Sequence, residues 1–463
     1  GRSGPAWQSP RMAPDTGAGD RPAAPHPPTG RALDRSIWAL AGPAVLTLAA
    51  EPLYLLVDTA VVGRISTDAL AGLAVASTLL VFATGMFIFL TFGTAATVAR
   101  LLGLGDPREA AELSVQGLWL GLACGLFASA VLGVFGDPLV HAFGASDAVA
   151  GDALLYLRIS LLGLPAVCVS MAGTGALRGH LDTRTPLVVT VAANSVNVVL
   201  ELVLVFGAGW GLAGSAAGTV VAQWGAAVTY VVVVLRLART EEVARAPDGP
   251  RLRRLAVVGR DLFVRTVALR GAFTAATVLA ARRGAAALAA YQIAIQWWSF
   301  LAYVLDALEA AAQSLVGRAL GADDAVLARR TAGRILGWSA GLGAVLGVAT
   351  VLLRGPVARL FTDQPDLLGP VTMSLVWVGV MQPVNGLAFA LDGILVGAGD
   401  QRFLAGAMVV SLAVLVLLGW VVTVLGTALW GLWLALTLFM ASRVLLLGLR
   451  YRTPRWQRTG APA

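Results

Sequence analysis

The chain contains no lysine and carries few charges for its length. Of its 463 residues only 13% are charged and 57% are hydrophobic, and the mean hydropathy is +0.78. A water-soluble protein of this size needs a far more charged surface, so the balance favours a membrane protein whose outside is covered by lipid. All 34 basic residues are arginine, and they collect between apolar segments. Because cytoplasmic loops of membrane proteins show this bias and no base-reading motif is present, we expect no nucleic-acid partner.

Cysteine and histidine are also scarce. Cys124 and Cys168 lie in apolar segments without a CxxC spacing, which argues against a disulfide or a zinc site. His26, His141 and His180 fall outside the apolar segments, so we expect no metal centre. Motifs of the HExxH and GxSxG types and phosphate-binding loops are absent, so we expect neither an enzyme nor a bound cofactor. A channel is disfavoured as well, because no pore-loop signature appears.

The second half of the chain repeats the first at a near-constant shift of 218 residues. The matched pairs include Leu70 and Leu288, Arg100 and Arg318, Gly103 and Gly321, Asp106 and Asp324, Pro165 and Pro383, and Asp182 and Asp400. Two acids within apolar segments do not repeat, since Asp58 matches Ala276 and Glu201 matches Gly419. A duplicated membrane protein with intramembrane carboxylates in one half favours a transporter with a one-sided coupling site.

Twelve apolar segments reach or exceed the ~20 residues that cross a bilayer as a helix. They span residues 37–63, 69–98, 113–135, 151–176, 186–207, 211–237, 262–281, 286–316, 331–353, 367–396, 403–425 and 429–449. We therefore predict an all-α polytopic membrane protein with twelve transmembrane helices in two parallel six-helix repeats.

The same pattern predicts the division of the chain and its orientation. We expect a disordered tail at 1–33, an N-lobe at 34–237, a cytoplasmic linker at 238–261, a C-lobe at 262–449 and a C-terminal tail at 450–463. Residues 236–265 contain eight arginines, whereas the loop 136–152 holds three aspartates and no arginine. By the positive-inside bias both termini and the linker face the cytoplasm, although Arg282 and Arg354 fall on the other side.

Three apolar segments of the first half carry polar stripes at helical spacing. The stripes consist of Glu51, Tyr54 and Asp58; of Asn194, Asn197 and Glu201; and of Thr219 and Gln223. Unpaired charges cost several kcal/mol in hydrocarbon, so the stripes should face each other or a water-filled cavity. A buried carboxylate can alternately hold a proton or a cation, and the neutral side chains can solvate its charged form. The alternative is that the stripes only join helices by hydrogen bonds.

Other intramembrane polar residues are weaker candidates. Asp306, Glu309 and Asp392 lie in the second half, and we expect Arg270 and Arg443 near the interfaces or paired with these acids. Met86, Trp297, Trp298 and Phe300 are candidates for lining a cavity or for packing.

Prolines inside the apolar segments predict bends. Pro43 and Pro52 lie in the first segment, and Pro165 and Pro383 lie in the paired fourth and tenth segments. Each proline removes a backbone hydrogen bond and kinks its helix. The first segment, which carries Asp58, is therefore a natural moving part.

Four segments resemble the multidrug and toxic compound extrusion (MATE) family, in its DinF-like branch. They are PLYLLVDTAVVG at 52–63, GALRGHLDTRTP at 175–186, NVVLE at 197–201 and LDGILVGAGD at 391–400. The resemblance covers residues 34–450 and implies two six-helix lobes in a V around a cavity that alternates sides. It implies a secondary antiporter of the bacterial cytoplasmic membrane that exports organic, often cationic, compounds against H⁺ or Na⁺. The expected partners are a small organic compound and the bilayer, and we expect a monomer.

The resemblance also implies a coupling site and a hinge. The coupling residues it assigns are Tyr54, Asp58, Asn197, Glu201 and Thr219, and Na⁺ would use Asp58, Asn197, Glu201 and Thr219. Pro43 matches the proline about which the first helix bends. The stripes add Asn194, and two departures concern acids, since Glu201 replaces the common Asp and Glu51 replaces the common Gln. Three carboxylates in one small cavity cannot all stay ionised, which favours H⁺ over Na⁺.

The alternative function is a lipid-linked oligosaccharide flippase, which relatives of this fold perform. Such a flippase usually has more spans and a cationic cavity, whereas the stripes of the first half are acidic.

Overall fold

The computed structural model describes residues 30–144 and 146–460, without the side chains of residues 49, 51–57 and 60. All regular structure in these residues is helical. The helices are α1 (Gly30–Val62), α2 (Thr67–Met86), α3 (Phe89–Gly103), α4 (Pro107–Ala142), α5 (Asp147–Ser160), α6 (Leu164–Gly179), α7 (Arg184–Leu202), η1 (Val203–Gly207), α8 (Gly211–Thr240), α9 (Gly249–Ala281), α10 (Ala285–Gly321), α11 (Ala325–Leu352), α12 (Arg354–Phe361), α13 (Pro365–Gly397), α14 (Gln401–Val424), α15 (Leu429–Arg452) and η2 (Pro454–Trp456).

The helices account for the predicted membrane spans. Among the described residues, ten stretches are long and apolar enough to cross a membrane, and the bent pair α5 and α6 makes an eleventh. Helix α1 has 33 residues, but it is not among these stretches because the structure does not describe all of its side chains. Its length of about 50 Å suffices for a crossing. The predicted all-helical, multi-span fold is confirmed, and with α1 the spans follow the twelve predicted segments in order.

The prolines act differently in the two paired spans. Helices α5 and α6 meet at an angle of 50°, and Pro165 stands in the first turn of α6, so the predicted bend of the fourth span is present. Helix α13 continues through Pro383 without a break. Nevertheless, a glycine of a neighbouring helix packs closely against the backbone of each proline. An added Cβ at Gly125 would lie 2.3 Å from Pro165 Cα, and one at Gly343 would lie 3.1 Å from Pro383 Cα. This contact therefore repeats in both halves.

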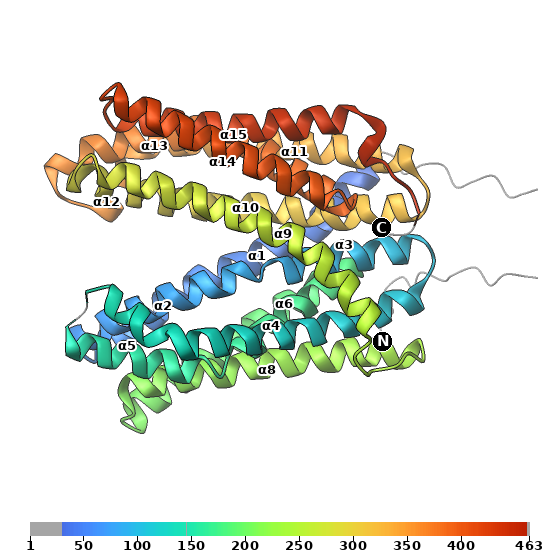
Figure 1. The fold of residues 1–463 in the computed structure, drawn as a ribbon, viewed down its shortest axis with the longest axis horizontal. Coiled ribbons are helices and arrows are strands. Elements are labelled where there is room, and N and C mark those ends of the chain that lie inside the picture. Colours follow the sequence, from blue (N-terminus) through green and yellow to red (C-terminus); the bar gives the residue numbers. More distant parts are fainter. Residues whose placement is uncertain (1–29, 145, 461–463) are drawn as a thin grey trace, which may run out of the picture.

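The helices form two groups that diverge toward one end of the molecule (Figure 1). Helices α2–α8 lie on one side and α9–α15 on the other, and α1 contacts α7 of the first group and α10 and α11 of the second. The ends that carry α5 and α12 lie apart, whereas the start of α1 and the end of α15 lie at the opposite end, where α3 meets α10. Figure 1 thus shows a V whose open side is opposite the start of α1 and the end of α15.

The two groups make their closest approach where α3 meets α10. An added Cβ at Gly103 would lie 2.1 Å from the carbonyl oxygen of Arg318, and one at Gly321 would lie 2.0 Å from that of Arg100. Because these glycines and arginines match in the repeat, the crossing is close to two-fold symmetric. Arg100 is buried and donates to the carbonyls of Ala398, Arg458 and Gly460. The segment after α15 is therefore bound between the two groups.

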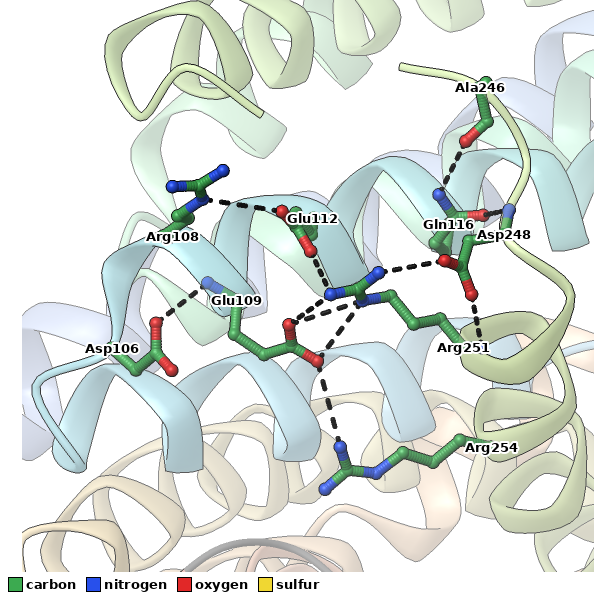
Figure 2. Close-up of polar contacts among 9 residues, drawn as sticks. All are labelled: Asp106, Arg108, Glu109, Glu112, Gln116, Ala246, Asp248, Arg251 and Arg254. Atoms are coloured by element: carbon green, nitrogen blue, oxygen red, sulfur yellow. Dashed lines mark hydrogen bonds and ion pairs between the residues drawn. The ribbon is translucent and has the colours of Figure 1, made fainter. Parts of the chain in front are cut away.

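The connection between the halves is held by α4 of the first half (Figure 2). Arg251, in the first turn of α9, pairs with Glu109 at 2.9 Å, with Glu112 and with Asp248 at 2.9 Å. Gln116 donates to the carbonyl of Ala246 and accepts from the backbone of Asp248, each at 2.9 Å. Residues of the predicted linker 238–261 thus comprise the end of α8, a short ordered segment and the start of α9. The carboxylates around Arg251 raise the pKa of its guanidinium.

We predict that the end of the molecule that carries the termini faces the cytoplasm, because the arginine-rich connections lie there. The positions Ala148 in α5 and Ala322 after α10 are exposed at opposite ends. In a variant without Cys124 and Cys168, a cysteine at 148 should react with an impermeant maleimide in intact cells. A cysteine at 322 should react only after the membrane is opened. The opposite labelling pattern would reverse the orientation.

Candidate functional site

Asp58 lies in the last turns of α1, toward the open side of the V. Its side chain is buried, and the Ser215 hydroxyl of α8 donates to its Oδ1 at 2.8 Å. One turn further along α8, the Thr219 hydroxyl donates to the Ser215 carbonyl at 3.0 Å. Ser215 was not among the predicted site residues. It stands four residues before Thr219, so extending that polar stripe by one turn would have found it.

Glu201 lies on α7 beside this pair and has no exposed surface. Its polar neighbours are Asp58 and Ser215. Within the part of the chain that the structure describes, neither of its carboxylate oxygens has a hydrogen-bond partner of good geometry. An added Cβ at Gly218 of α8 would lie 3.3 Å from the Glu201 nitrogen, so the two helices approach closely here. Two adjacent buried carboxyls, one without a fixed partner, can share a single proton or cation.

Three further members of the stripes lie on the same helices, α7 and α8. Asn197 is buried one turn before Glu201, and Asn194 donates to the carbonyl of Ala50 on α1 at 3.3 Å. Thr219 is buried on α8. The chain after Glu201 passes into the π-helical turn η1, an irregularity that often occurs at functional sites and that the sequence did not predict.

Three other members of the stripes are not placed at this carboxyl pair. The side chains of Glu51 and Tyr54 lie outside the described residues, so the predicted third carboxylate is not placed. Gln223 of α8 lies against Gly163 at the break between α5 and α6. Its amide therefore belongs to the bend of the fourth span.

The other end of α1 is attached to the C-terminal half. Asp34 accepts hydrogen bonds from Arg334 at 2.6 and 2.8 Å and from the Trp338 indole at 2.8 Å, all from α11. These bonds lower the pKa of Asp34. Trp38 packs edge-on against Trp338 with ring centroids 5.4 Å apart. Helix α1 is thus held by the second half near its start and by the first half at Asp58.

Pro43 lies in α1 between these two attachments. The Thr47 hydroxyl donates to the Pro43 carbonyl at 2.9 Å. A proline interrupts the helical hydrogen bonds, and a back-bonding threonine adds to the tendency to bend. Its position suits the predicted hinge.

Two of the three candidate acids of the C-terminal half are paired with arginines, whereas Asp306 makes no ion pair among the described residues. Asp392 of α13 accepts from Arg265 of α9 at 2.5 Å and from Arg443 of α15, and Arg265 lies 3.6 Å from Glu309 of α10. All four side chains are buried. The expectation that Arg443 pairs with an acid therefore agrees with the structure. The arrangement joins four helices by charge and leaves Asp392 little freedom to exchange ions.

A large cavity of about 750 Å³ opens between α2, α9 and α14. Phe82 and Met86 line it from α2, Arg270 and Arg282 from α9, and Gly419 and Trp420 from α14. Met86, which the sequence suggested for either cavity lining or packing, thus lines a cavity. Trp298 is instead buried in the core, and the Trp297 indole donates to Thr350 at 3.1 Å. Arg270 faces this cavity.

The chain belongs to the MATE family. The family model described as MatE matches residues 43–203 and again residues 263–422, so each half of the repeat carries one copy. Protein DETOXIFICATION 44, chloroplastic, of Arabidopsis thaliana is 33% identical over 91% of this chain and 82% of its own length. DNA damage-inducible protein F of Escherichia coli is 30% identical over 90% of this chain and 92% of its own length, in agreement with the DinF-like resemblance.

Solved structures show the same fold. A Vibrio cholerae MATE transporter superposes with a TM-score of 0.83 at 18% identity, covering 91% of this chain and 97% of that one. An outward-facing multidrug resistance MATE transporter superposes with a TM-score of 0.81 at 19% identity, covering 91% and 95%. This chain is therefore a multi-pass membrane transporter and not an enzyme.

We predict that Asp392 stabilises the fold. In Asp392→Asn, Arg265 and Arg443 lose their shared anion inside the protein, and breaking a buried pair in this way costs roughly 3–5 kcal/mol. The midpoint of thermal unfolding in detergent should fall. Asp366→Asn, at an exposed position of the same helix, should leave it unchanged. An Asp392→Asn protein as stable as the wild type would show that the ion pairs do not hold the four helices.

Proposed function

We propose that this protein exports organic compounds in exchange for an inward-moving cation, with Asp58 and Glu201 as the coupling carboxyls. The observation that supports this proposal most is the fully buried Glu201 beside Asp58, without a fixed partner among the described residues. A charge in this position is costly, so the pair takes up a proton or a cation whenever it is closed off from water. In the other half, by contrast, Asp392 and Glu309 lie beside arginines that offset their charge.

The ion that the site favours is H⁺, and Na⁺ is the alternative. A proton needs one carboxyl oxygen, and the adjacent carboxyl can then accept a hydrogen bond from it. Sodium requires several oxygens at fixed short distances, and Asp58, Asn197, Glu201 and Thr219 are the candidates for that shell. The longer side chain of Glu201 departs from the family's common Asp and makes such a shell less rigid.

Helix α1 connects ion binding to movement of the halves. Neutralising Asp58 and Glu201 removes their repulsion and lets Ser215 and Thr219 exchange hydrogen bonds with them. Helix α1 then bends at Pro43, while Asp34 and Trp38 stay on α11 of the second half. With the termini in the cytoplasm, the V in Figure 1 opens outward, and this state releases the compound and takes up the ion.

The charge of the exported compound is a separate matter. The carboxylates favour an organic cation, which is the compound that the sequence predicted, whereas Arg270 and Arg282 of the cavity favour an anion. The flippase alternative has less support, because the family model that matches is MatE and the spans follow twelve predicted segments.

Removing either carboxyl should abolish coupled efflux. We expect Asp58→Asn and Glu201→Gln to reduce transport driven by an ion gradient by at least about 10-fold, since neither side chain can carry a proton or an ionic charge. The measurement is dye efflux from cells with matched protein levels. Asp68→Asn, an exposed acid of α2, serves as the control and should retain transport. Full efflux by Asp58→Asn would contradict the assignment.

The driving ion should be H⁺. We expect proteoliposomes in Na⁺-free medium to transport when the side into which the V opens is acidified, because protons then load the carboxyl pair from that side. Potassium salts at equal ionic strength control for screening. Transport that starts only when Na⁺ is added to the same side would show that Na⁺ is the coupling ion.

A further inference from the structure

The large cavity lies beside the positions that the repeat matches to the two carboxylates of the first half. Asp58 and Glu201 of the first half match Ala276 and Gly419 of the second. Gly419 lines the cavity, and so does Ala275, the neighbour of Ala276. Ala276 itself is buried in the core, and a Cβ added at Gly419 would lie 2.6 Å from Leu279 Cδ1, so the cavity lies next to the matched positions and does not replace them. An arginine pair, Arg270 and Arg282, lies in the same wall.

Arg270 is placed where a charge is costly. It lies near the middle of the predicted span 262–281, and its side chain is exposed to the cavity. Among the described residues it has no acidic partner, and the described lining of the cavity contains no carboxylate. Arg265, five residues earlier on the same helix, is by contrast buried and held by Asp392 and Glu309. An intramembrane arginine without an acid needs a negative charge from elsewhere.

Gly85 of α2 has no side chain and thereby leaves space for the Arg270 guanidinium. A Cβ added at Gly85 would lie 2.4 Å from Nη2 of Arg270, so the arginine extends from α9 across to the backbone of α2. Arg270 therefore lies between the two halves, which move relative to each other during transport in our proposed mechanism. A compound bound to it would contact both.

The other lining residues indicate the chemical character of the compound that the cavity can bind. Phe82, Met86, Leu279 and Trp420 present apolar and aromatic surface. A volume of about 750 Å³ falls in the range of sites for drug-sized compounds. Guanidinium groups bind carboxylate and sulfonate oxygens through two parallel hydrogen bonds.

We propose that the cavity between α2, α9 and α14 is the compound-binding site and that it binds lipophilic aromatic anions through Arg270. The inference rests on the proposed export function and gives its substrate class. Arg282 directly follows the last residue of α9, toward the open side, and its charge attracts anions to the cavity entrance. An inside-negative membrane potential favours export of an anion, so this charge adds to the driving force of the inward cation.

Two probes of similar shape and opposite charge test the proposal. The purified full-length protein in detergent is titrated with 1-pyrenebutyrate and with 1-pyrenemethylammonium, and binding is measured by energy transfer from tryptophan to pyrene. We expect the anion to bind at least roughly 10-fold more tightly than the cation, as one charge-assisted hydrogen bond provides. Arg270→Gln should lose about that factor for the anion alone, and Arg270→Lys should lose less. Arg253→Gln, an exposed arginine of the same helix, should bind as the wild type does.

A side chain at Gly85 is the second variant. Gly85→Leu would displace the guanidinium without removing its charge, so anion binding should weaken as in Arg270→Gln. Equal affinity for both probes, tighter binding of the cation, or no effect of Arg270→Gln would each overturn the proposal. Binding of a short-chain phosphatidylglycerol that depends on Arg270, without any binding of pyrenebutyrate, would assign the site to a lipid headgroup and would overturn the proposal too.

Transport in proteoliposomes separates this inference from the proposed function. Gradient-driven transport of the pyrene cation that depends on Glu201, with no anion binding, would leave the antiporter intact and refute the anion site. Anion binding that depends on Arg270, without gradient-driven transport of either probe, would support the site and refute the antiporter.

Discussion

The cost of a charge in hydrocarbon is the constraint on which this molecule depends, and its two halves meet that cost in different ways. In the second half, Asp392 and Glu309 are neutralised by Arg265 and Arg443, which join four helices. In the first half, Asp58 has a serine hydroxyl and Glu201 has no fixed partner among the described residues. The ion pairs of the second half lose their stability when either partner is removed. The carboxyls of the first half can instead be neutralised by a proton or cation that enters from outside. The same fold thus supplies a rigid half and a responsive half.

Helix α1 connects the two arrangements. Its first turns are fixed to α11 by Asp34 and Trp38, and its last turns bring Asp58 to α8. Since Pro43 lies between these points, a change of charge at Asp58 has a mechanical path to the other half. On the side of the termini, the glycine contacts of α3 and α10 and the carbonyls bound by Arg100 keep the halves together. The structure therefore has an open side and a closed side, as alternating access requires.

Much of the fold could be predicted from the sequence because lipid permits only a narrow set of solutions. Apolar segments of sufficient length had to be helices, and matches such as Asp106 with Asp324 revealed the repeat. Asp58 and Glu201 stood out because acids are rare in such segments and because Ala276 and Gly419 replace them. The rotation of each helix was harder to predict. Gln223 shares a stripe with Thr219, yet its side chain lies against Gly163 at the bend of the fourth span.

Contacts between distant segments could not be predicted. Arg100 binds carbonyls about 360 residues away, and Arg270 and Arg265 look alike in the sequence although, among the described residues, only Arg265 has acids around it.

The most direct test of the account is whether protonation of Asp58 and Glu201 moves the two halves relative to each other. Spin labels at Ala148 and Leu360, on α5 and α12, report the width of the open side by electron–electron distance measurement. We predict that the distance distribution shifts between acidic and alkaline pH in the wild-type background and stays fixed in the Asp58→Asn, Glu201→Gln double variant. The same pH-dependent shift in the double variant would contradict the central role of these carboxyls.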